Sequence, residues 1–548
     1  MGTNNTNSTT PRTNVDPIKI VDLFAGPGGL GEGFSASGKF RITVSAEMET
    51  SAHATLRLRA FYRTLMRKGE AALNPYFELC NRKFLPPTTE APLPHWDNDT
   101  QRAWEEACCE ALQLTLGKPS DNEKLDEAII RNGISANTSW VLIGGPPCQA
   151  YSLVGRARNK GKDDYRAEDD HRHFLYKEYL RIIARYKPSV FVMENVKGIL
   201  SSRVGEQQIF HGILHDLADP DAAMDLPKQE VSGYRIHSLV TNTCFTRQDD
   251  PTQIDARDFI VRAEQYGVPQ ARHRVILLGI REDICLSHGE GWSPPRLSPS
   301  SEVTVKEAIG TLPRLRSKIS RGQDSEEKWK NCVTRHVHDL AKEAVNNGLS
   351  DLAAELKNLE DTGNLPSETC IFDSYKKPAT PSLALNDWYA RGCTIKALET
   401  HLNHEARGHM DGDLRRYVFA SAFAQAKGRS PKGYADFSLS GLAPAHENWK
   451  SGKFADRFRV QLADRPATTV TSHIAKDGHY FIHYDPSQCR SLSVREAARL
   501  QTFPDDYFFQ GNRTQQYHQV GNAVPSYLAH QIARCVLSAL DCVSLPEA

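Results

Sequence analysis

Short apolar runs alternate with a helical stripe over the first half of the chain. The runs have the length and continuous hydrophobicity of strands buried in a parallel sheet. They cover residues 19–24, 41–46, 140–143, 189–193 and 274–280. Residues 171–186 instead repeat apolar side chains such as Leu175, Tyr179 and Ile183 at helical spacing. Strands that alternate with helices predict an α/β fold with a Rossmann-like, doubly wound sheet.

The alternation stops after residue 281 and helical periodicity returns near the end of the chain. A chain of 548 residues exceeds the size at which a single core keeps growing. We therefore expect a sheet domain over residues 18–281, a second, smaller domain over 282–488, and a helical segment over 489–548. Residues 1–17 are rich in Asn and Thr and predict a disordered leader.

Residues 47–140 connect two of the expected strands and are more numerous than one crossover requires. They predict a helical insertion at about residues 57–135. Two amphipathic helices are expected in it, at residues 57–68 and 101–116, with a solvated basic face. The alternative for this basic face is contact with a nucleic acid backbone.

Composition narrows the class of protein only slightly. Lys plus Arg and Asp plus Glu number 67 each, so the zero net charge neither supports nor excludes a nucleic acid partner. The sequence has neither an apolar run long enough to cross a membrane nor a signal peptide. Its 12 cysteines lack paired spacing, which favours reduced thiols over disulfides. We expect a soluble, cytoplasmic protein.

A glycine-rich turn follows the first apolar run. The sequence DLFAGPGGLGEGF satisfies the pattern G-x-G-x-x-G at Gly26, Gly28 and Gly31. A strand that runs into such a turn and then into a helix builds a nucleotide-sized cleft at the sheet edge. The acidic Glu47 would accept hydrogen bonds from ribose hydroxyls there, and Met48 would lie against an adenine. The turn alone leaves open a dinucleotide, another nucleoside cofactor, and a plain tight turn.

A cysteine follows another of the apolar runs. Cys148 comes directly after Gly-Gly-Pro-Pro, a rigid turn that ends at Pro147. The loop at residues 155–166 carries five Arg or Lys residues against two acids, so it would close over a polyanion and lower the pKa of the thiol. The alternatives are a buried structural thiol and a solvated charged loop.

An acid and two arginines accompany the remaining runs. Glu194 ends a buried strand, where a carboxylate is costly unless it is paired or functional. Arg272 and Arg274 have the alternate spacing that places side chains on one side of a strand. We expect Cys148, Glu194 and the two arginines to meet at one edge of the sheet.

Histidines in the second domain raise the question of a metal site. His404 and His409 are five residues apart instead of the four of a zinc-protease helix, so they would not share a helical face. Cys332, His336 and His338 lie close together but lack an obvious fourth ligand. We predict no metal.

Basic stretches in the same domain are candidates for contact with phosphates and base edges. They cover residues 407–416 and 427–432. An ordinary solvated surface is the alternative. Residues 452–459 and 465–472 are expected to support that domain.

The motifs and their order resemble those of the DNA (cytosine-5) methyltransferases of bacterial restriction–modification systems. The motifs that carry the resemblance are DLFAGPGG, GGPPCQAYS, ENVKG, QARHR, RPATTVTS, REAARLQTFPDDY and QVGNAVP. Together they are far more specific than a glycine pattern, and they cover the catalytic half of the chain. The resemblance implies a Rossmann-like methyltransferase sheet that depends on S-adenosylmethionine, with a target-recognition domain at residues 282–488. It also implies that the segment over residues 489–548 returns to the sheet domain, where its last helix packs beside the first glycine turn.

The same resemblance implies roles for the four reactive side chains. Cys148 would add to carbon 6 of a flipped-out cytosine, which allows carbon 5 to take a methyl group. Glu194 would bind ring nitrogen 3 and the exocyclic amine and share a proton with the base. Arg274 would contact the carbonyl oxygen of the base and Glu194, and Arg272 would position the loop or the backbone.

The cofactor implied is S-adenosylmethionine. Its pocket is assigned by resemblance to Phe24, Gly26, Gly28, Glu47, Met48, Pro147, Leu175 and Asn522. Met48 replaces an aromatic residue that some relatives place there. Gly117 and Lys118 stand where relatives have Gly-Asp, so the contact with the adenine amino group is left unassigned.

Double-stranded DNA is the partner that the resemblance implies, along with a cognate restriction endonuclease unless the enzyme is a solitary modifier. A monomer suffices for the mechanism, and the enzyme would be cytoplasmic and associated with the nucleoid. An RNA cytosine methyltransferase is an alternative that the long second domain disfavours. A silent DNA-binding regulator is disfavoured by the intact reactive residues, and a dehydrogenase is the least favoured alternative.

Overall fold

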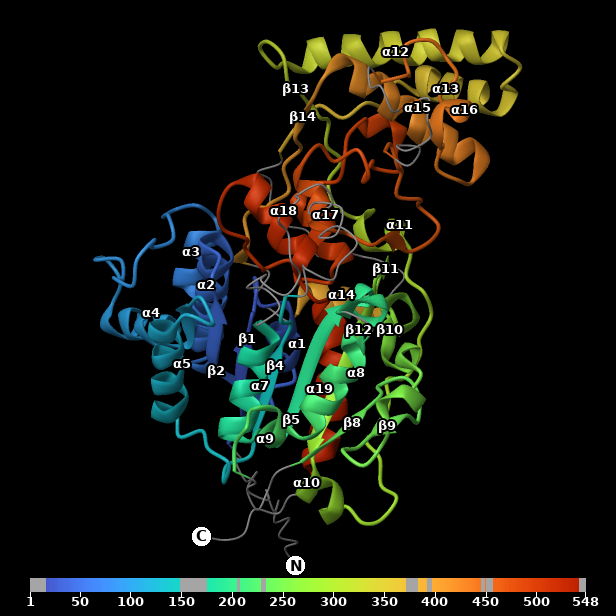
Figure 1. Ribbon diagram of the computed structural model, residues 1–548. Coiled ribbons are helices and arrows are strands. Elements are labelled where there is room, and N and C mark those ends of the chain that lie inside the picture. Colours follow the sequence, from blue (N-terminus) through green and yellow to red (C-terminus); the bar gives the residue numbers. More distant parts are fainter. Residues whose placement is uncertain are drawn as a thin grey trace, which may run out of the picture.

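The computed structural model describes residues 16–147, 175–204, 207–227, 233–370, 383–391, 397–444, 449 and 457–541 (Figure 1). Cys148, the basic loop at residues 155–166 and nearly all of the expected leader lie outside these ranges, as does the start of the helix expected at residues 171–186. Among the described residues, none of the helices is both long and apolar enough to cross a membrane.

The described residues form a nine-stranded sheet at the centre of the larger domain (Figure 1). The strands are β1 (Ile18–Leu23), β2 (Phe40–Glu47), β3 (Ala111–Gln113), β4 (Trp140–Gly144), β5 (Val190–Val196), β8 (Tyr234–His237), β9 (Cys244–Phe245), β10 (Ile260–Arg262) and β12 (His273–Arg281). Their order is β3-β2-β1-β4-β5-β12-β8-β9, and β10 pairs with β12. The strands from β3 to β5 are parallel, whereas β12 is antiparallel to β5 and β8.

The strand order reverses between β1 and β4. The chain proceeds from β1 to β2 and β3 on one side, and from β4 to β5 on the other. In an open α/β sheet, a ligand binds at this reversal, outside the carboxyl ends of the strands. The predicted Rossmann-like α/β sheet is confirmed, and each of the five apolar runs forms part of one of its strands.

Helices cover both faces of the sheet. On one face α5 (Pro119–Arg131), α7 (Leu175–Tyr186) and α8 (Ile209–Ala218) pack in a core with Val21 and Leu142. On the other face α1 (Gly29–Ser35) and α19 (Ser526–Leu540) pack with Ile20 and Ile143. Because neighbouring residues of one strand enter opposite cores, the inner positions of the strands are mostly apolar, with exceptions such as Asp22 in β1.

The helix α19 lies directly against α1, as the resemblance implied for the last helix. A Cβ added at Gly33 would lie 2.4 Å from the Cβ of Ala529, and one added at Gly29 would lie 2.4 Å from the carbonyl oxygen of Val524. Only glycine permits this approach. The segment that starts at residue 489 therefore supports the glycine turn from behind.

The connection between β2 and β4 is only partly an insertion. It contains α2 (Thr50–Arg67), α3 (Asn74–Cys80) and α4 (Asn98–Glu110), and then β3 and α5. The strand β3 pairs with β2 and extends the main sheet. The helix expected at residues 101–116 therefore ends at Glu110, because the chain enters this strand.

The expectation of a solvated basic face on the first helix of this connection is wrong. Arg57, Arg59 and Arg63 of α2 are all buried. Arg59 pairs with Glu32 of α1 at 2.8 Å, and Arg63 pairs with Glu110 of α4. Since these cations face acids inside the protein, that face of α2 is not available to a nucleic acid.

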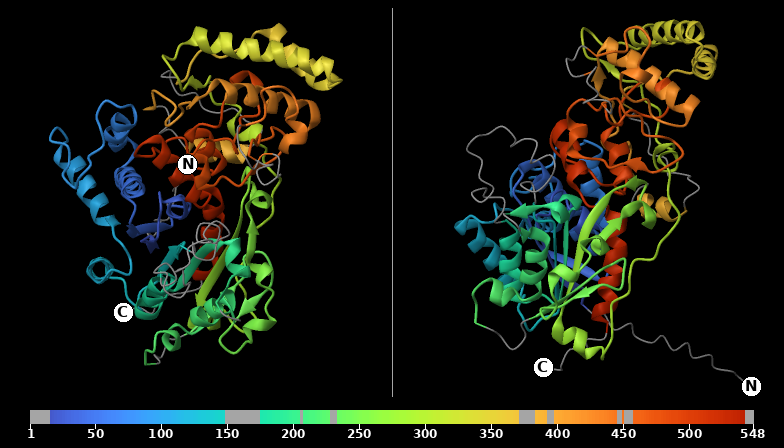
Figure 2. Two further views of the ribbon diagram at one scale, coloured as in Figure 1. Left: turned by 45° about the horizontal axis from the view of Figure 1, so that its top comes forward. Right: turned by 45° about the vertical axis from the view of Figure 1, so that its right-hand side comes forward.

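A second hydrophobic core lies outside the sheet domain. It joins α12 (Glu326–Asn346), α13 (Ser350–Thr362) and α15 (Asp411–Lys427) through residues such as Trp329 and Phe419. Figures 1 and 2 show these helices at one end of the molecule, beyond α17 (Val494–Leu500) and α18 (Arg513–Asn522). The described helices of this unit thus have a core of their own.

One helix from the middle of the segment 282–488 packs on the sheet domain instead. In α14 (Leu383–Ala390), Trp388 donates a hydrogen bond to the carbonyl oxygen of Thr502 at 2.6 Å, and Tyr389 donates one to that of Arg499 at 2.7 Å. The following Arg391 reaches Glu32 of α1 at 2.9 Å. The segment expected to form the second domain therefore includes a helix, α14, that packs against the larger domain.

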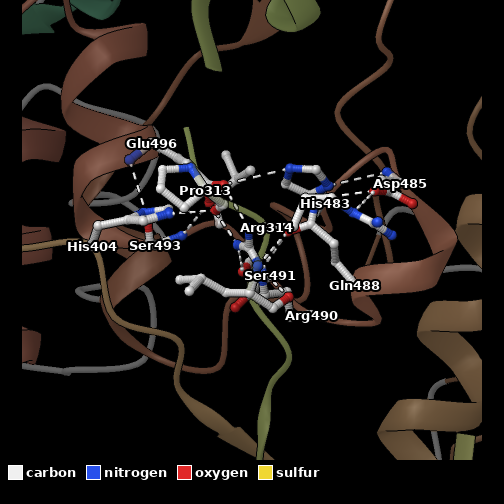
Figure 3. A network of polar contacts seen from close by, with 12 residues as sticks. Pro313, Arg314, His404, His483, Asp485, Gln488, Arg490, Ser491, Ser493 and Glu496 are labelled. Carbon is white, nitrogen blue, oxygen red and sulfur yellow. Dashed lines mark hydrogen bonds and ion pairs between the residues drawn. The ribbon is translucent and has the colours of Figure 1, made fainter. Parts of the chain in front are cut away.

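Polar contacts join the entry and the exit of the second domain (Figure 3). His404 contacts the carbonyl oxygen of Pro313 through Nε2 and the hydroxyl of Ser493 through Nδ1, both at 2.8 Å. Arg490 donates to both carboxylate oxygens of Glu496 at 2.6 Å. Burial lowers the pKa of His404 to about 4, so its ring is neutral and the charge of Glu496 is balanced by Arg490. These contacts hold the segment that enters the second domain next to the segment that leaves it.

Candidate functional site

The glycine turn closes on the carboxylate at the end of β2. The backbone N–H of Gly26 donates to Glu47 Oε2 at 2.8 Å, and that of Glu49 donates to Oε1 at 2.8 Å. Phe24, Gly26 and Gly28 have positive φ angles of 56°, 56° and 94°. Because side chains rarely tolerate this conformation, the two glycines allow the tight course of the turn. The turn and Glu47 form one unit at the strand reversal.

Glu47 is half-buried and still able to accept hydrogen bonds. Burial raises its pKa, although the N–H groups of Glu49 and Gly26 act in the opposite direction. Each carboxylate oxygen has received one backbone N–H and keeps a further acceptor site. Next to it, the side chain of Met48 is 60% exposed. An acceptor pair and an open apolar surface therefore lie side by side at this edge.

A second carboxyl group, that of Asp22, lies beneath the same turn. It is fully buried, and neither oxygen has a hydrogen-bond partner among the described residues. Burial raises its pKa from 3.8 to about 8, against the influence of Arg63. The group is therefore protonated in the folded protein at neutral pH.

Replacement of Asp22 by asparagine is expected to flatten the dependence of stability on pH. Between about pH 4 and pH 8 the folded protein holds a proton on Asp22 that the unfolded chain has lost. The contribution of Asp22 to the free energy of unfolding must therefore fall as the pH rises from about 4 to about 8. Melting temperatures measured at pH 5, 6, 7 and 8 should decline more steeply for the parent than for Asp22→Asn. Equal slopes would show that Asp22 is ionised in the folded state.

The strand β4 ends in a turn that approaches its neighbours closely. A Cβ added at Gly144 would lie 2.4 Å from the carbonyl oxygen of Leu23, and one added at Gly145 would lie 3.1 Å from Glu194 Oε2. Asn195 of β5 donates a hydrogen bond to the carbonyl oxygen of Pro146 at 3.2 Å. The half-buried Pro147 is the last described residue before Cys148. The chain thus leaves the sheet beside Glu194.

Glu194 and Arg274 form an ion pair at this edge. Arg274 Nε lies 2.9 Å from Glu194 Oε1, and both side chains keep a small exposed fraction, 15% and 13%. The pair forms because β12 runs antiparallel to β5, which places Arg274 opposite Val196, two residues along from Glu194. A hydrogen-bonding group with an adjacent cation is therefore presented next to the turn that leads to Cys148.

Arg272 has a different environment from Arg274. It is buried, and it donates to the carbonyl oxygens of Val470 at 3.0 Å and Gly521 at 3.3 Å. Burial and the nearby Arg274 hold its pKa below the ordinary range, while Glu194 acts in the opposite direction. Arg272 thus ties β12 to two distant segments of the chain, whereas Arg274 reaches Glu194.

Leu175 and Asn522 are placed less directly. Leu175 is half-buried at the start of α7, and Asn522 is exposed at the end of α18. Within the described part of the chain, neither makes a hydrogen bond to the glycine turn. The structure therefore brings together Phe24, Gly26, Gly28 and Glu47 at the strand reversal, with Met48 beside them.

Sequence reasoning missed a buried ionic cluster behind the glycine turn. Glu32 of α1 accepts hydrogen bonds from Arg59 at 2.9 and 2.8 Å and from Arg391 at 2.9 Å, and Arg59 also lies 3.2 Å from Asp506. The hydroxyl of Tyr507 donates to the carbonyl oxygen of Pro27. The sequence signal for this cluster was the pair of adjacent aspartates before the tyrosine in the motif REAARLQTFPDDY, the second of which is Asp506.

The cysteine and histidines considered for a metal have other partners. Cys332 donates to Asp411 Oδ2 at 3.0 Å, and His336 Nε2 contacts Oδ1 of the same residue at 3.1 Å. Arg335 already neutralises that carboxylate at 2.6 Å. His338 contacts Glu360 instead, at 2.8 Å. The ligand-type atoms of Cys332, His336 and Asp411 therefore lie within 4.8 Å of one another, with Arg335 on the same carboxylate, whereas His338 lies outside this group.

Comparison with known proteins gives consistent matches over most of the chain. The family model of the C-5 cytosine-specific DNA methylases matches residues 100–221 and 258–538. The type II methyltransferase M.Bpa9945I of Bacillus paralicheniformis is 32% identical over 95% of this chain and 99% of its own. The DNA (cytosine-5-)-methyltransferase M.ApeKI of Aeropyrum pernix is 27% identical over 95% and 99%. A solved E. coli structure, described as a DNA modification methyltransferase encoded within a prophage, gives a TM-score of 0.47 at 18% identity, covering 96% of this chain and 99% of that one.

Proposed function

Because the chain belongs to the C-5 cytosine-specific DNA methylase family and is a cytosine-5 methyltransferase of the restriction–modification type, we propose that it methylates a flipped-out cytosine in a specific duplex DNA sequence. Cys148 forms the covalent bond to the base, and S-adenosylmethionine is the methyl donor. A cognate restriction endonuclease is the partner that this function implies.

The observation that supports this proposal best is the pair of Glu194 and Arg274 beside the turn that leads to Cys148. The pair is held at 2.9 Å and is only partly exposed. An acid that bonds the ring nitrogen and the amine of cytosine, next to a cation for the carbonyl oxygen, matches the hydrogen-bonding edge of the base. Because Gly145 has no side chain, the carboxylate of Glu194 lies close to the backbone directly before the two prolines.

The reaction needs a nucleophile because carbon 5 of cytosine is not reactive enough by itself. The Cys148 thiolate forms a bond to carbon 6, and the electron pair displaced from the ring is stabilised through ring nitrogen 3 by Glu194 and through the carbonyl oxygen by Arg274. S-adenosylmethionine supplies an electrophilic methyl group that carbon 5 can take. Transfer of the carbon 5 proton to water then lets the electron pair of that bond form the double bond between carbons 5 and 6. The bond from carbon 6 to Cys148 breaks, and the sulfur leaves as thiolate with the electron pair of that bond.

The described residues at the strand reversal fit this cofactor. Glu47 retains acceptor sites on both oxygens for two ribose hydroxyls, and the exposed Met48 offers an apolar surface for an adenine. After β3, Lys118 is the N-cap residue of α5, and Asp121 of that helix accepts a hydrogen bond from the backbone N–H of Thr115 at 3.1 Å. Asp121 is thus engaged by the backbone of its own chain. The carboxylate that would hold the cofactor is that of Glu47, and it would hold the ribose.

The proposal is tested by incubating purified protein and S-adenosylmethionine with unmethylated duplex DNA and, separately, with RNA transcripts of the same sequence. Bisulfite sequencing should show protected cytosines in one short sequence context of the DNA and none in the RNA. Protection of the RNA alone would favour an RNA methyltransferase. Unmodified DNA and RNA from a protein that binds the cofactor would favour a silent regulator.

Replacement of Glu194 by glutamine is expected to slow methyl transfer by about 10²- to 10³-fold. The amide keeps the shape of the side chain but cannot share a proton with ring nitrogen 3, and Arg274 loses its anionic partner. Single-turnover methylation of a duplex is the measurement, with cofactor affinity expected to stay unchanged. Glu264→Gln is the matched control, because Glu264 pairs with His273 at 2.7 Å outside the site. Equal rates in the two variants would contradict the role of Glu194.

A further inference from the structure

Three side chains with metal-binding atoms converge between α12 and α15 in the second domain. Cys332 and His336 are buried and four residues apart on α12, so they lie on one face of that helix. Asp411 is the first residue of α15. The sulfur, a ring nitrogen and a carboxylate oxygen of these residues all lie within 4.8 Å of one another. Among the described residues this is the only such group of three, so a metal ion would find three protein ligands here.

The spacing of these atoms suits a tetrahedral zinc ion. The Cys332 sulfur lies 3.0 Å from Oδ2 of Asp411, and Nε2 of His336 lies 3.1 Å from Oδ1. Zinc bonds of about 2.3 Å to sulfur and about 2.0–2.2 Å to nitrogen and oxygen separate neighbouring ligand atoms by about 3.3–3.6 Å. The side chains therefore need to move apart by only a few tenths of an ångström. Asp411 is exposed, so its carboxylate can make this adjustment.

The charges of the three side chains balance a divalent cation. A thiolate and a carboxylate carry two negative charges, and a neutral imidazole completes the set. Binding would release the thiol proton of Cys332 to the solvent, because the thiolate is the form that binds a metal. Sulfur and imidazole ligands favour zinc over magnesium and calcium, which prefer oxygen ligands. Zinc is therefore the ion that this group of residues selects.

Arg335 is compatible with an ion at this position. It donates to Oδ2 of Asp411 at 2.6 Å, whereas His336 lies on the side of Oδ1. A carboxylate that binds a metal is commonly hydrogen-bonded as well, and such a bond orients it. The Arg335 side chain is more than half exposed, so water and salt screen its repulsion of a cation. Oδ1 can thus bind the ion while Oδ2 keeps its bond to Arg335.

A fourth ligand can reach the ion from the solvent. Cys332 and Asp411 line an open pocket of about 710 Å³, and a water molecule from it would complete the four ligands of zinc. Figure 1 shows α12 and α15 at the end of the molecule away from the sheet that carries Glu194. The ion would therefore have a structural role, separate from the proposed chemistry.

We propose that Cys332, His336 and Asp411 bind one Zn²⁺ ion, which joins α12 to the start of α15. The sequence predicted no metal because a further ligand was lacking near Cys332, and Asp411, 75 residues beyond His336, supplies one in the structure. An ion that only the folded state binds adds its binding free energy to the stability of the fold. This inference goes beyond the proposed function and does not depend on it.

The zinc affinity of the full-length protein tests the proposal. After metal has been removed with EDTA, Zn²⁺ is titrated in competition with a chromophoric chelator. Cys332→Ser and His336→Asn should each weaken the binding of one ion per chain at least about 100-fold. His338→Asn is the matched control on the same helix, because His338 contacts Glu360 instead. Cys109→Ser, at an exposed thiol, is the control for the cysteine, and both controls should keep the parent affinity.

Cobalt substitution distinguishes a lost ligand from a damaged fold. Co²⁺ bound in place of Zn²⁺ should give the absorption band of a cobalt–thiolate bond in the parent and in His338→Asn, but not in Cys332→Ser. Asp411→Asn changes an exposed side chain without changing its size, so it should keep the helix content measured by circular dichroism and still lose zinc affinity. Added Zn²⁺ should raise the melting temperature of the parent and leave that of Cys332→Ser unchanged.

Three outcomes would overturn the inference. The first is a parent protein that takes up no zinc in competition with the chelator. The second is parent-like affinity in Cys332→Ser and Asp411→Asn, which would place the ion elsewhere in the chain. The third is a loss of affinity in His338→Asn or Cys109→Ser as large as that in Cys332→Ser, because neither control removes a proposed ligand.

Discussion

A protein in which Cys148 is replaced by serine is expected to bind DNA and cofactor normally and to transfer methyl groups at least about 10⁴-fold more slowly. The reason is the difference in acidity between the two side chains. A thiol with an ordinary pKa near 8.5 provides thiolate at neutral pH, whereas a serine hydroxyl provides almost no alkoxide. Without an anionic nucleophile no bond to carbon 6 forms, and carbon 5 stays unreactive.

Mass spectrometry of the complex makes this prediction more specific. A DNA duplex whose target cytosine carries fluorine instead of hydrogen on carbon 5 should remain covalently attached to the parent protein. The last step requires loss of a proton from carbon 5, and this cytosine has none to lose. The attachment should disappear with Cys148→Ser. Cys109→Ser, at an exposed thiol in α4, should keep both activity and attachment. Attachment to another residue would contradict the assignment of the nucleophile.

Replacement of Glu32 by glutamine is expected to lower the free energy of unfolding by about 3–5 kcal/mol. Burial alone would raise the pKa of this carboxyl, but Arg59 and Arg391 lower it to about 2. The variant would remove the carboxylate that these two buried guanidinium groups share, although Arg59 would keep Asp506 at 3.2 Å. Such a loss is far larger than that of an exposed pair.

Chemical unfolding followed by circular dichroism measures this loss. Glu326→Gln is a suitable control, because Glu326 pairs with Lys330 at 2.6 Å while the two side chains are 47% and 37% exposed, and its unfolding midpoint should not change. A second check uses pH. The folded pKa of Glu32 lies below its ordinary value of 4.5, so its contribution is present above about pH 4.5 and is lost as the pH falls towards 2. A variant as stable as the parent at pH 7 would show that the cluster does not stabilise the fold.

The sheet was predictable from sequence because its strands are buried on both faces. Residues 140–143 are apolar at every position, as are residues 190–193 after the polar Ser189, and the structure places these runs in β4 and β5. The three-residue strand β3 gave no comparable signal. It was therefore included in a predicted helix, although it determines where the connection rejoins the sheet.

The environment of α2 was not predictable from its own residues. The helix carries several arginines, and local periodicity cannot show that Glu32 and Asp506 approach them from segments distant in sequence. The same limit applies to Arg272 and Arg274, which are the same residue type two positions apart. Their sequence did not reveal that Arg272 is buried against Val470 whereas Arg274 pairs with Glu194. The motifs brought Glu194 and Arg274 to attention, but only tertiary packing distinguished the environments of the two arginines.

The contact between α1 and α19 has a consequence for synthesis of the protein on the ribosome. The sheet face that carries Ile20 and Ile143 is covered by α19, whose residues are translated after every strand of the sheet. A nascent chain must therefore keep this apolar face exposed until residues 526–540 emerge. During that interval the glycine turn lacks the support of α19, so we expect the catalytic domain to complete its fold only late in translation.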